Sequence, residues 1–289
     1  MNSILRERIY KLTSRHCLWW FLAVALACQS LVLIFLTQGS VEAVNAMLVW
    51  GGALLLLQEQ GPGWGARPGK AQVLAGATLV LAVLWRGQQI TGHDGASSLL
   101  PLLAGVALSL LATPARNLKP YGKALLIMSL LPAVRMTNRF STVELSLITA
   151  RITQLLLMLC GLPVQVFGNI VQLPGGSVQV AGSCSGLSML VQLIGVGLIF
   201  ALAFPMRHFW QNGLMVLVAA LLAVFANSIR IALLALISAS TVANKNWWFV
   251  LFHEGEGSLI FSGVAVLAFV WLYGLWMKWQ VASLGASHE

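Results

Sequence analysis

Eight hydrophobic runs divide this 289-residue chain, and they restrict its fold more than any other feature. A helix crosses the hydrocarbon core of a bilayer, about 30 Å thick, with about 20 residues. The runs lack the alternation of barrel strands, so we expect helices. Because 58% of the residues are hydrophobic and only 9% are charged, a soluble globular protein is excluded. We predict an all-α polytopic membrane protein with about eight transmembrane helices. They lie near 17–36, 41–58, 71–86, 97–113, 121–135, 185–204, 212–238 and 257–277.

In a membrane protein of this kind, the basic residues behind the net charge of +9 indicate how the chain is oriented in the bilayer. Basic residues concentrate in the cytoplasmic loops of membrane proteins. If the N-terminus is cytoplasmic, most of the 17 Lys and Arg residues fall in loops on that side. We therefore predict a multi-pass protein of the inner (plasma) membrane with both termini in the cytoplasm. We expect contact with membrane lipid and no nucleic-acid partner.

This topology requires that residues 141–162 do not cross the bilayer. Apolar residues recur at helical spacing, while Glu144, Thr149, Arg151 and Thr153 interrupt the other face. This pattern favours an amphipathic helix in the outer interface. If this segment spanned the membrane, Arg207 and Lys278 would move to the outer side, against the charge rule.

The segment NIVQLPGGSVQV, residues 169–180, follows this helix. Polar and apolar residues alternate around Pro174-Gly175-Gly176, which predicts a short β-hairpin, on the outer side in this topology. We divide the chain into N-terminal membrane helices, residues 1–140 with five spans, and a membrane core at 141–289. The core holds the interfacial helix, the hairpin and three spans.

Cys184 lies in AGSCSGLSML, where the hairpin ends and the sixth run begins. Ser183 or Ser185 can cap the helix that starts there, and a helix N-terminus favours a thiolate. Cys184 is therefore a candidate nucleophile. A lone cysteine in a membrane protein is more often a small packing residue, which is our interpretation of Cys17, Cys28 and Cys160. Their spacing indicates neither a zinc site nor a disulfide framework, and we expect no metal and no cofactor.

Asn227 and Arg230 lie three residues apart in FANSIRIALL, on one side of the seventh predicted span. A guanidinium within a span costs about 2.5–3.5 kcal/mol on insertion scales, so it normally faces protein or water. Alternatively, Arg230 lies near enough to the outer end of the helix to extend to the headgroups. That interpretation leaves Asn227 without a partner.

His253, in NWWFVLFHEGEGSLIF, precedes the last predicted span. Trp247 and Trp248 are typical of the membrane interface and place His253 near the outer boundary. Glu254 and Glu256 can orient the imidazole or be solvated loop acids.

The predicted topology places Cys184, Arg230 and His253 on one side of the membrane at similar depth. Together they fit cysteine acyl transfer, in which a thiolate attacks a peptide carbonyl and the histidine protonates the leaving amine. The guanidinium then offsets charge on the tetrahedral oxygen. Two other peptidase classes lack their residues: Asp94 is the only aspartate, and HEGEG has no second histidine for a zinc motif.

At these motifs, LPGGSVQVAGSCSGL, FANSIRI and FHEGEGSLIF, the chain resembles the exosortase/archaeosortase family of membrane cysteine transpeptidases. The resemblance covers residues 145–275. It implies a nucleophile at Cys184, an arginine at Arg230 and a third catalytic residue at His253. We expect Asn227 to support this site. It also implies that the protein cleaves the C-terminal sorting tails of secreted proteins on the extracytoplasmic side, through a thioester. Such a tail has a short motif, a transmembrane helix and a basic cluster.

Several points stay open. Arg135 and Arg139 match no family motif, and we keep them as possible contacts to substrate or lipid headgroups. The acceptor of the acyl group is water, an amine or a lipid. The alternative function is a non-catalytic transporter or scaffold in which Arg230 binds an anion between helices.

Overall fold

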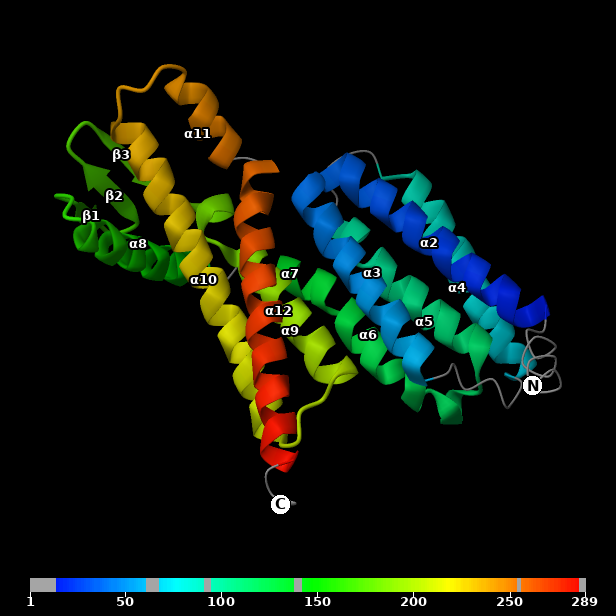
Figure 1. Ribbon diagram of the computed structural model, residues 1–289. Helices are drawn as coiled ribbons and strands as arrows, with labels where there is room; N and C mark the ends of the chain where they lie inside the picture. The colour runs from blue at the N-terminus through cyan, green and yellow to red at the C-terminus, as the bar shows by residue number, and fades with distance from the viewer. Residues whose placement is uncertain (1–13, 61–67, 91–94, 138–141, 254–255, 286–289) are drawn as a thin grey trace. The chain divides into compact units, whose positions relative to one another are not determined.

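The computed structural model describes residues 14–60, 68–90, 95–137, 142–253 and 256–285. The chain divides into two compact units, Met1–Pro132 and Ala133–Glu289. Where the structure describes them, all the predicted hydrophobic runs lie in helices (Figure 1).

The first unit consists of helices joined by short turns of 3-10 helix. Two buried tryptophans tie its helices together: Trp19 Nε1 donates to Leu108 O at 2.9 Å, and Trp50 Nε1 donates to Ser30 Oγ at 2.8 Å. These bonds matter because an unpaired indole N–H destabilises a buried site. The elements are α2 Ser14–Gln38, α3 Ser40–Gln60, α4 Lys70–Gln88, η1 Gly95–Ser98, α5 Leu100–Ala112, η2 Ala115–Asn117, η3 Lys119–Tyr121 and α6 Gly122–Met128, and α7 Leu130–Thr137 follows across the unit boundary.

Among the described residues, four helices are long and apolar enough to cross a membrane. They are His16–Gln38, Ser40–Gln58, Phe209–Ala239 and Gly257–Ala282. Leu100–Ala112 and Leu187–Ala203 are apolar but shorter than 18 residues. The chain is therefore a helical membrane protein, while eight spans and the orientation of the termini stay predictions. The run at 121–135 divides into two helices, α6 and α7.

The second unit is built around α10, Phe209–Ala239, which packs against every other helix of the unit's core and against the sheet. Its partners are α8 Thr142–Leu159, α9 Leu187–Ala203, α11 Lys245–His253 and α12 Glu256–Gly285. Figure 1 shows the sheet and α11 near one end of α10, with the C-terminus of α12 near its other end. The C-terminal half of α12 is fixed to the end of α9, where Tyr273 Oη donates to Phe204 O at 2.6 Å.

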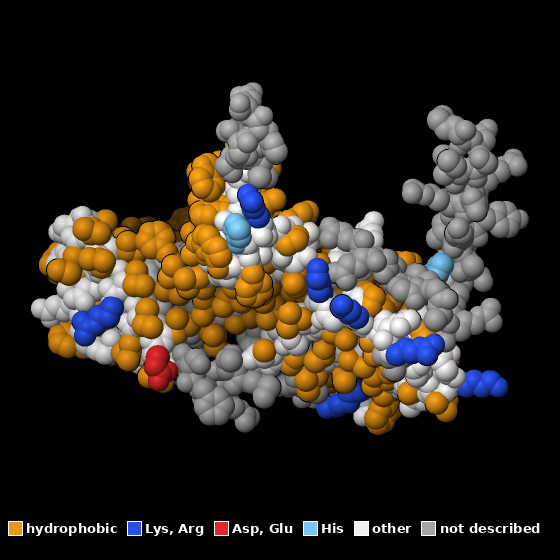
Figure 2. Space-filling model, turned by 90° about the horizontal axis from the view of Figure 1, so that it is seen from below, with side chains coloured by type: hydrophobic (Ala, Val, Ile, Leu, Met, Phe, Trp, Pro, Cys, Tyr) orange, Lys and Arg blue, Asp and Glu red, His pale blue; other side chains and the backbone are white. Residues whose placement is uncertain are grey.

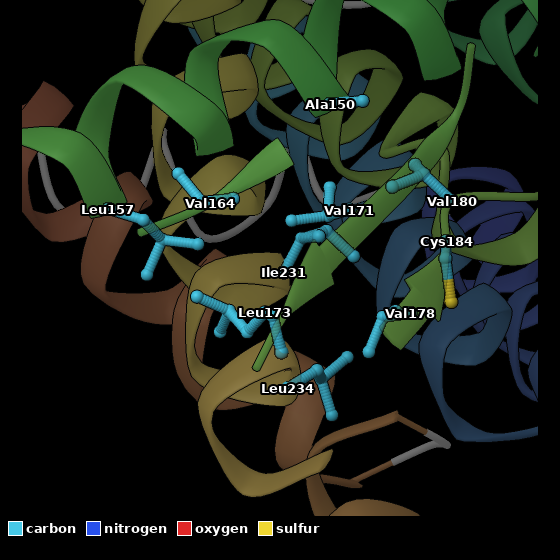
Figure 3. Close-up of a cluster of buried hydrophobic side chains, with 11 residues drawn as sticks. Ala150, Leu157, Val164, Val171, Leu173, Val178, Val180, Cys184, Ile231 and Leu234 are labelled. Carbon is cyan, nitrogen blue, oxygen red and sulfur yellow. The ribbon is translucent and has the colours of Figure 1, made fainter. Parts of the chain in front are cut away.

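The predicted hairpin is confirmed, and a third strand joins it. The antiparallel sheet has the order β1 Gln165–Phe167, β2 Ile170–Leu173 and β3 Gly176–Gln179. Leu173 pairs with Gly176, so Pro174 and Gly175 form the two-residue turn. Val171 and Val178 are paired and buried, and with Ile231 and Leu234 of α10 they belong to the hydrophobic cluster in Figure 3. The sheet therefore has one face on α10, which agrees with the alternation of polar and apolar residues along its strands.

Helix α8 is amphipathic, but its small polar residues face protein. Thr149 and Thr153 are fully buried, whereas Ile148 and Leu155 are 52% and 57% exposed. The outward face of α8 is apolar and is suited to lipid. The hydroxyl groups of Thr149 and Thr153 point into the unit, where they find hydrogen-bond partners. The position of α8 in the membrane interface stays a prediction.

The surface agrees with a lipid environment. Figure 2 shows a face on which hydrophobic side chains predominate and charged side chains are few. Large exposed apolar side chains occur along the long helices, including Phe21, Leu36, Leu217 and Leu267. In water such a surface would drive association, so most of it is suited to lipid.

Candidate active site

Cys184 ends a short 3-10 turn, η4 Gly182–Cys184, that follows strand β3. Pairing continues just beyond the strand, because the Val180 amide donates to Asn169 O and Asn169 Nδ2 donates back to Val180 O, both at 2.8 Å. The turn then closes with a bond from the Cys184 amide to Ala181 O at 2.6 Å. Cys184 is only 2% exposed and lies at the margin of the cluster in Figure 3.

Two helices hold the consecutive carbonyl groups of Cys184 and Ser185. Asn227 Nδ2 of α10 donates to Cys184 O at 3.1 Å, and Thr149 Oγ1 of α8 donates to Ser185 O, also at 3.1 Å. Both donors are fully buried. Since buried hydrogen bonds of this kind fix backbone position, the loop carrying Cys184 is held from two sides.

Gly186 allows Asn227 to approach this loop. Its φ is +91°, a conformation that side chains other than glycine rarely adopt. A Cβ atom there would also lie 2.5 Å from Asn227 Nδ2. The Cys-Ser-Gly order of the motif therefore has a packing reason as well as a chemical one.

The predicted helix cap differs in detail. Helix α9 begins at Leu187 with Gly186 as its N-cap, so Cys184 lies in the preceding turn and not at the first helical residue. Ser185 caps helix α9 only weakly, because its Oγ accepts from the Leu187 amide at 3.4 Å. The same Oγ donates to Gly182 O at 2.8 Å. The Ser183 side chain lies outside the described part of the structure.

Arg230 is buried in protein, 4% exposed, and does not extend to the surface. Its guanidinium lies close to the Cys184 thiol. Nη1 donates to Ser258 Oγ, at the start of α12, at 2.8 Å. Nε and Nη2 are buried and have no well-aligned partner among the described residues. One edge of the guanidinium is thus fixed by α12, and the other edge is unpaired.

The side-chain amide of Asn227 also has only one of its two polar atoms in a hydrogen bond among the described residues. Its Nδ2 is bonded to Cys184 O, but its Oδ1 is buried with no partner in the described part of the chain. Unpaired buried polar atoms are rare because each loses its interactions with water. Two such groups beside one cysteine indicate a site that receives a polar ligand.

His253 is the last residue of α11 and is half-buried. Its ring stacks on Phe249, with centroids 5.3 Å apart. Phe249 and Phe252 pack against the hydrophobic cluster that contains Cys184. The structure therefore places His253 on a helix that packs against the cluster containing Cys184, and direct contact between the imidazole and the thiol stays a prediction.

Gly257 explains part of the HEGEG motif. A Cβ atom at this position would lie 1.9 Å from Leu251 O. The first turn of α12 therefore packs directly on the backbone of α11, and only glycine fits. This contact sets the positions of His253 and Ser258 relative to each other.

Sequence reasoning missed three residues: Thr149, Thr153 and Ser258. Thr153 Oγ1 donates to Ser228 O at 3.2 Å and links α8 to α10, one turn beyond Thr149. The two threonines are four residues apart, a spacing that places them on one helix face and that could have indicated a polar contact with protein.

Four predicted residues cannot be placed in the site. Glu254 and Arg139 lie outside the described residues, and the side chains of Arg135 and Glu256 are also not described. Cys17, Cys28 and Cys160 are exposed on helix surfaces or helix ends. Among the described residues no group of three or more His, Cys, Asp or Glu side chains is arranged to hold a metal ion.

Comparison with known proteins gives one match. The family described as transmembrane exosortase matches residues 38–270, which is more than half of the chain. The match extends into the N-terminal helices, beyond the residues that carried the resemblance in the sequence. No curated protein and no solved structure matches the chain.

Proposed function

Because the chain belongs to the transmembrane exosortase family, we propose that it is a membrane-embedded cysteine protease or transpeptidase. Its substrates are secreted proteins whose C-terminal tails carry a short motif, a transmembrane helix and a basic cluster. Cleavage near the motif takes place on the extracytoplasmic side. The acyl group passes through a thioester at Cys184 to water, an amine or a lipid.

One observation carries this proposal: a buried guanidinium with an unpaired Nε–Nη2 edge lies beside a buried thiol. A guanidinium edge of this kind donates two N–H groups to an anionic oxygen. Preorganised donors of this type act most strongly where water is excluded. Arg230 is therefore suited to stabilise charge on the carbonyl oxygen that Cys184 attacks.

The backbone of the turn supports this role for Arg230. In cysteine and serine hydrolases, backbone amides often donate hydrogen bonds to the oxyanion. Here the Cys184 amide donates to Ala181 O, and the Ser185 amide donates to Gly182 O at 3.2 Å. Since both amides are already used in the turn, the side chain of Arg230 is the available donor among these groups.

The reaction then follows in two halves. The Cys184 thiol first gives its proton to His253; the thiolate sulfur then forms a bond to the carbonyl carbon, and the negative charge moves to the oxygen near Arg230. The carbon–nitrogen bond breaks, and the nitrogen takes a proton from His253, leaving a thioester. Attack by the acceptor releases Cys184, with His253 taking the acceptor's proton. Asn227 and Thr149 act through the Cys184 loop as positioning residues.

Access to the site requires a local opening, because Cys184 and Arg230 are buried. The half-buried groups around them, His253 and Ser258, come from α11 and the start of α12. Substrate access between these segments would place the scissile bond against Cys184 with Arg230 behind it.

The direct test uses purified enzyme and a tailed substrate in liposomes. We expect wild type to shorten the substrate and Cys184→Ser to leave it intact. Intact-mass analysis of wild type quenched during turnover should detect an acyl adduct on Cys184. Cys160→Ser is the matched control, because Cys160 is exposed at the end of α8. Full processing by Cys184→Ser would remove the nucleophile and, with it, the proposed function.

A further inference from the structure

Two kinds of buried atom in the site have no hydrogen-bond partner among the described residues, an acceptor on Asn227 and donors on Arg230. Asn227 Oδ1 can only accept, and Arg230 Nε and Nη2 can only donate. Both residues belong to α10 and are three positions apart, so their Cβ atoms are about 5–6 Å from each other. They therefore present an acceptor and a donor pair on the same face of one helix.

A peptide group carries the complementary pair, one N–H donor and one C=O acceptor. We propose that Asn227 and Arg230 together bind the scissile peptide group itself, the carbonyl oxygen against Arg230 and the amide N–H against Asn227 Oδ1. This inference rests on the proposed function. It adds to that function that the site reads the backbone of the cleaved bond and that Asn227 touches the substrate.

The other half of the Asn227 amide supports this geometry. Because Nδ2 is bonded to Cys184 O, the side-chain amide cannot rotate without losing that bond. Its Oδ1 is thereby held beside the residue that attacks. Gly186, whose missing Cβ admits Asn227, keeps the amide in contact with the loop.

The chemistry of the bound bond is balanced. The Cys184 thiolate, formed when the thiol proton passes to His253, donates an electron pair to the carbonyl carbon, and the oxygen takes the carbonyl π pair. On collapse the carbon–nitrogen bond breaks, and its electron pair stays on nitrogen. The nitrogen keeps the hydrogen bound to Asn227 Oδ1 and gains a second proton from His253. Asn227 therefore orients the nitrogen so that its lone pair faces the histidine.

An ester replacement tests this contact, because an ester has the carbonyl but no N–H. Once mass spectrometry of the product locates the cleaved bond, a synthetic substrate is made with an ester at that bond and compared with the amide. For Asn227→Ala, we expect the amide to slow about tenfold more than the ester, the worth of one hydrogen bond.

The amide-to-ester rate ratio does not depend on how much of the enzyme is active, so partial misfolding of a variant does not change it. If Asn227→Ala yields no folded protein, Asn227→Ser gives the same comparison. Two controls should slow both substrates equally: Thr149→Val, which acts through the loop, and Arg230→Lys, because both substrates carry a carbonyl.

Equal slowing of amide and ester by Asn227→Ala would overturn the inference and leave Asn227 as a positioning residue only. Failure of the proposed function would look different: both substrates would then be processed by Cys184→Ser, or neither would be processed by wild type.

Discussion

Arg230 of α10 and Ser258 of α12 are joined by a hydrogen bond of 2.8 Å from Nη1 to Oγ. The bond fixes the guanidinium through one nitrogen and leaves the Nε–Nη2 edge buried and unpaired within the described structure. An arginine in a span is therefore oriented by the first turn of another helix. Ser258, directly after the HEGEG segment, lies in that turn.

Ser258→Ala should lower activity without unfolding the protein. The guanidinium loses its only well-aligned partner among the described residues, and hydrogen bonds to charged groups are worth about 1.5–3 kcal/mol, or roughly ten- to a hundredfold in rate. Tail processing is the measurement. Ser262→Ala is a matched control, because Ser262 Oγ bonds only within its own helix, to Leu259 O. Equal loss in both variants would contradict the role of Ser258.

Thr149→Val should slow processing about tenfold by releasing Ser185 O beside the nucleophile. Thr149→Ser, which retains the hydroxyl, should recover most of the rate. Thr153→Val also removes one buried hydrogen bond, but to Ser228 O, away from the Cys184 loop. We expect both valine variants to lose about 1 kcal/mol of stability, with only Thr149→Val changing the alkylation rate of Cys184. If the alkylation rate of Cys184 is unchanged in both valine variants, α8 does not position the Cys184 loop.

Arg230→Lys should lower activity at least a hundredfold, the usual effect of losing an oxyanion donor. An ammonium group supplies a point charge but not the planar pair of N–H groups. Arg151→Lys is the control, since Arg151 is exposed and bonds only to Gln154 in its own helix. Wild-type rates from Arg230→Lys would mean that Arg230 acts only as a charge or an anchor.

Gly257→Ala should destabilise the second unit by more than 2 kcal/mol, because the added Cβ meets the backbone carbonyl of Leu251 and neither helix can move freely. Gly263→Ala lies in the same helix with open space around it. There we expect a gain of about 0.5–1 kcal/mol from helix propensity. Thermal unfolding in detergent measures both, and similar melting temperatures would disprove the close contact.

Single-cysteine variants test the predicted topology. A membrane-impermeant maleimide added to intact cells should label Cys160 and not Cys17, both of which are exposed in the fold. Cys184 should react more slowly than Cys160, because it is buried, and should react faster in the presence of substrate if the site opens. A transporter with a structural cysteine predicts no such dependence. Labelling of Cys17 from outside would invert the assigned orientation.

Several features followed from local rules. Alternation around Pro174-Gly175 predicted the hairpin, because side-chain direction in a strand is set residue by residue. Hydrophobic runs predicted helices, because lipid leaves the backbone no other partner. Asn227 and Arg230 could be assigned to one face from their spacing alone. The first β-strand and the division of the run at 121–135 had no comparable local signal.

The sequence by itself determined a helical membrane protein, its hairpin, and the residue types suited to cysteine acyl transfer, since hydropathy, turn chemistry and reactivity are properties of neighbouring residues. The tertiary structure decided which side chains complete the site. Thr149, which lies 35 positions before Cys184 in the sequence, holds the Cys184 loop through a hydrogen bond. Ser258, which lies 28 positions after Arg230, holds its guanidinium in the same way. Such bonds depend on how α8, α10 and α12 cross. No local pattern encodes that crossing, because it results from the packing of whole helix faces.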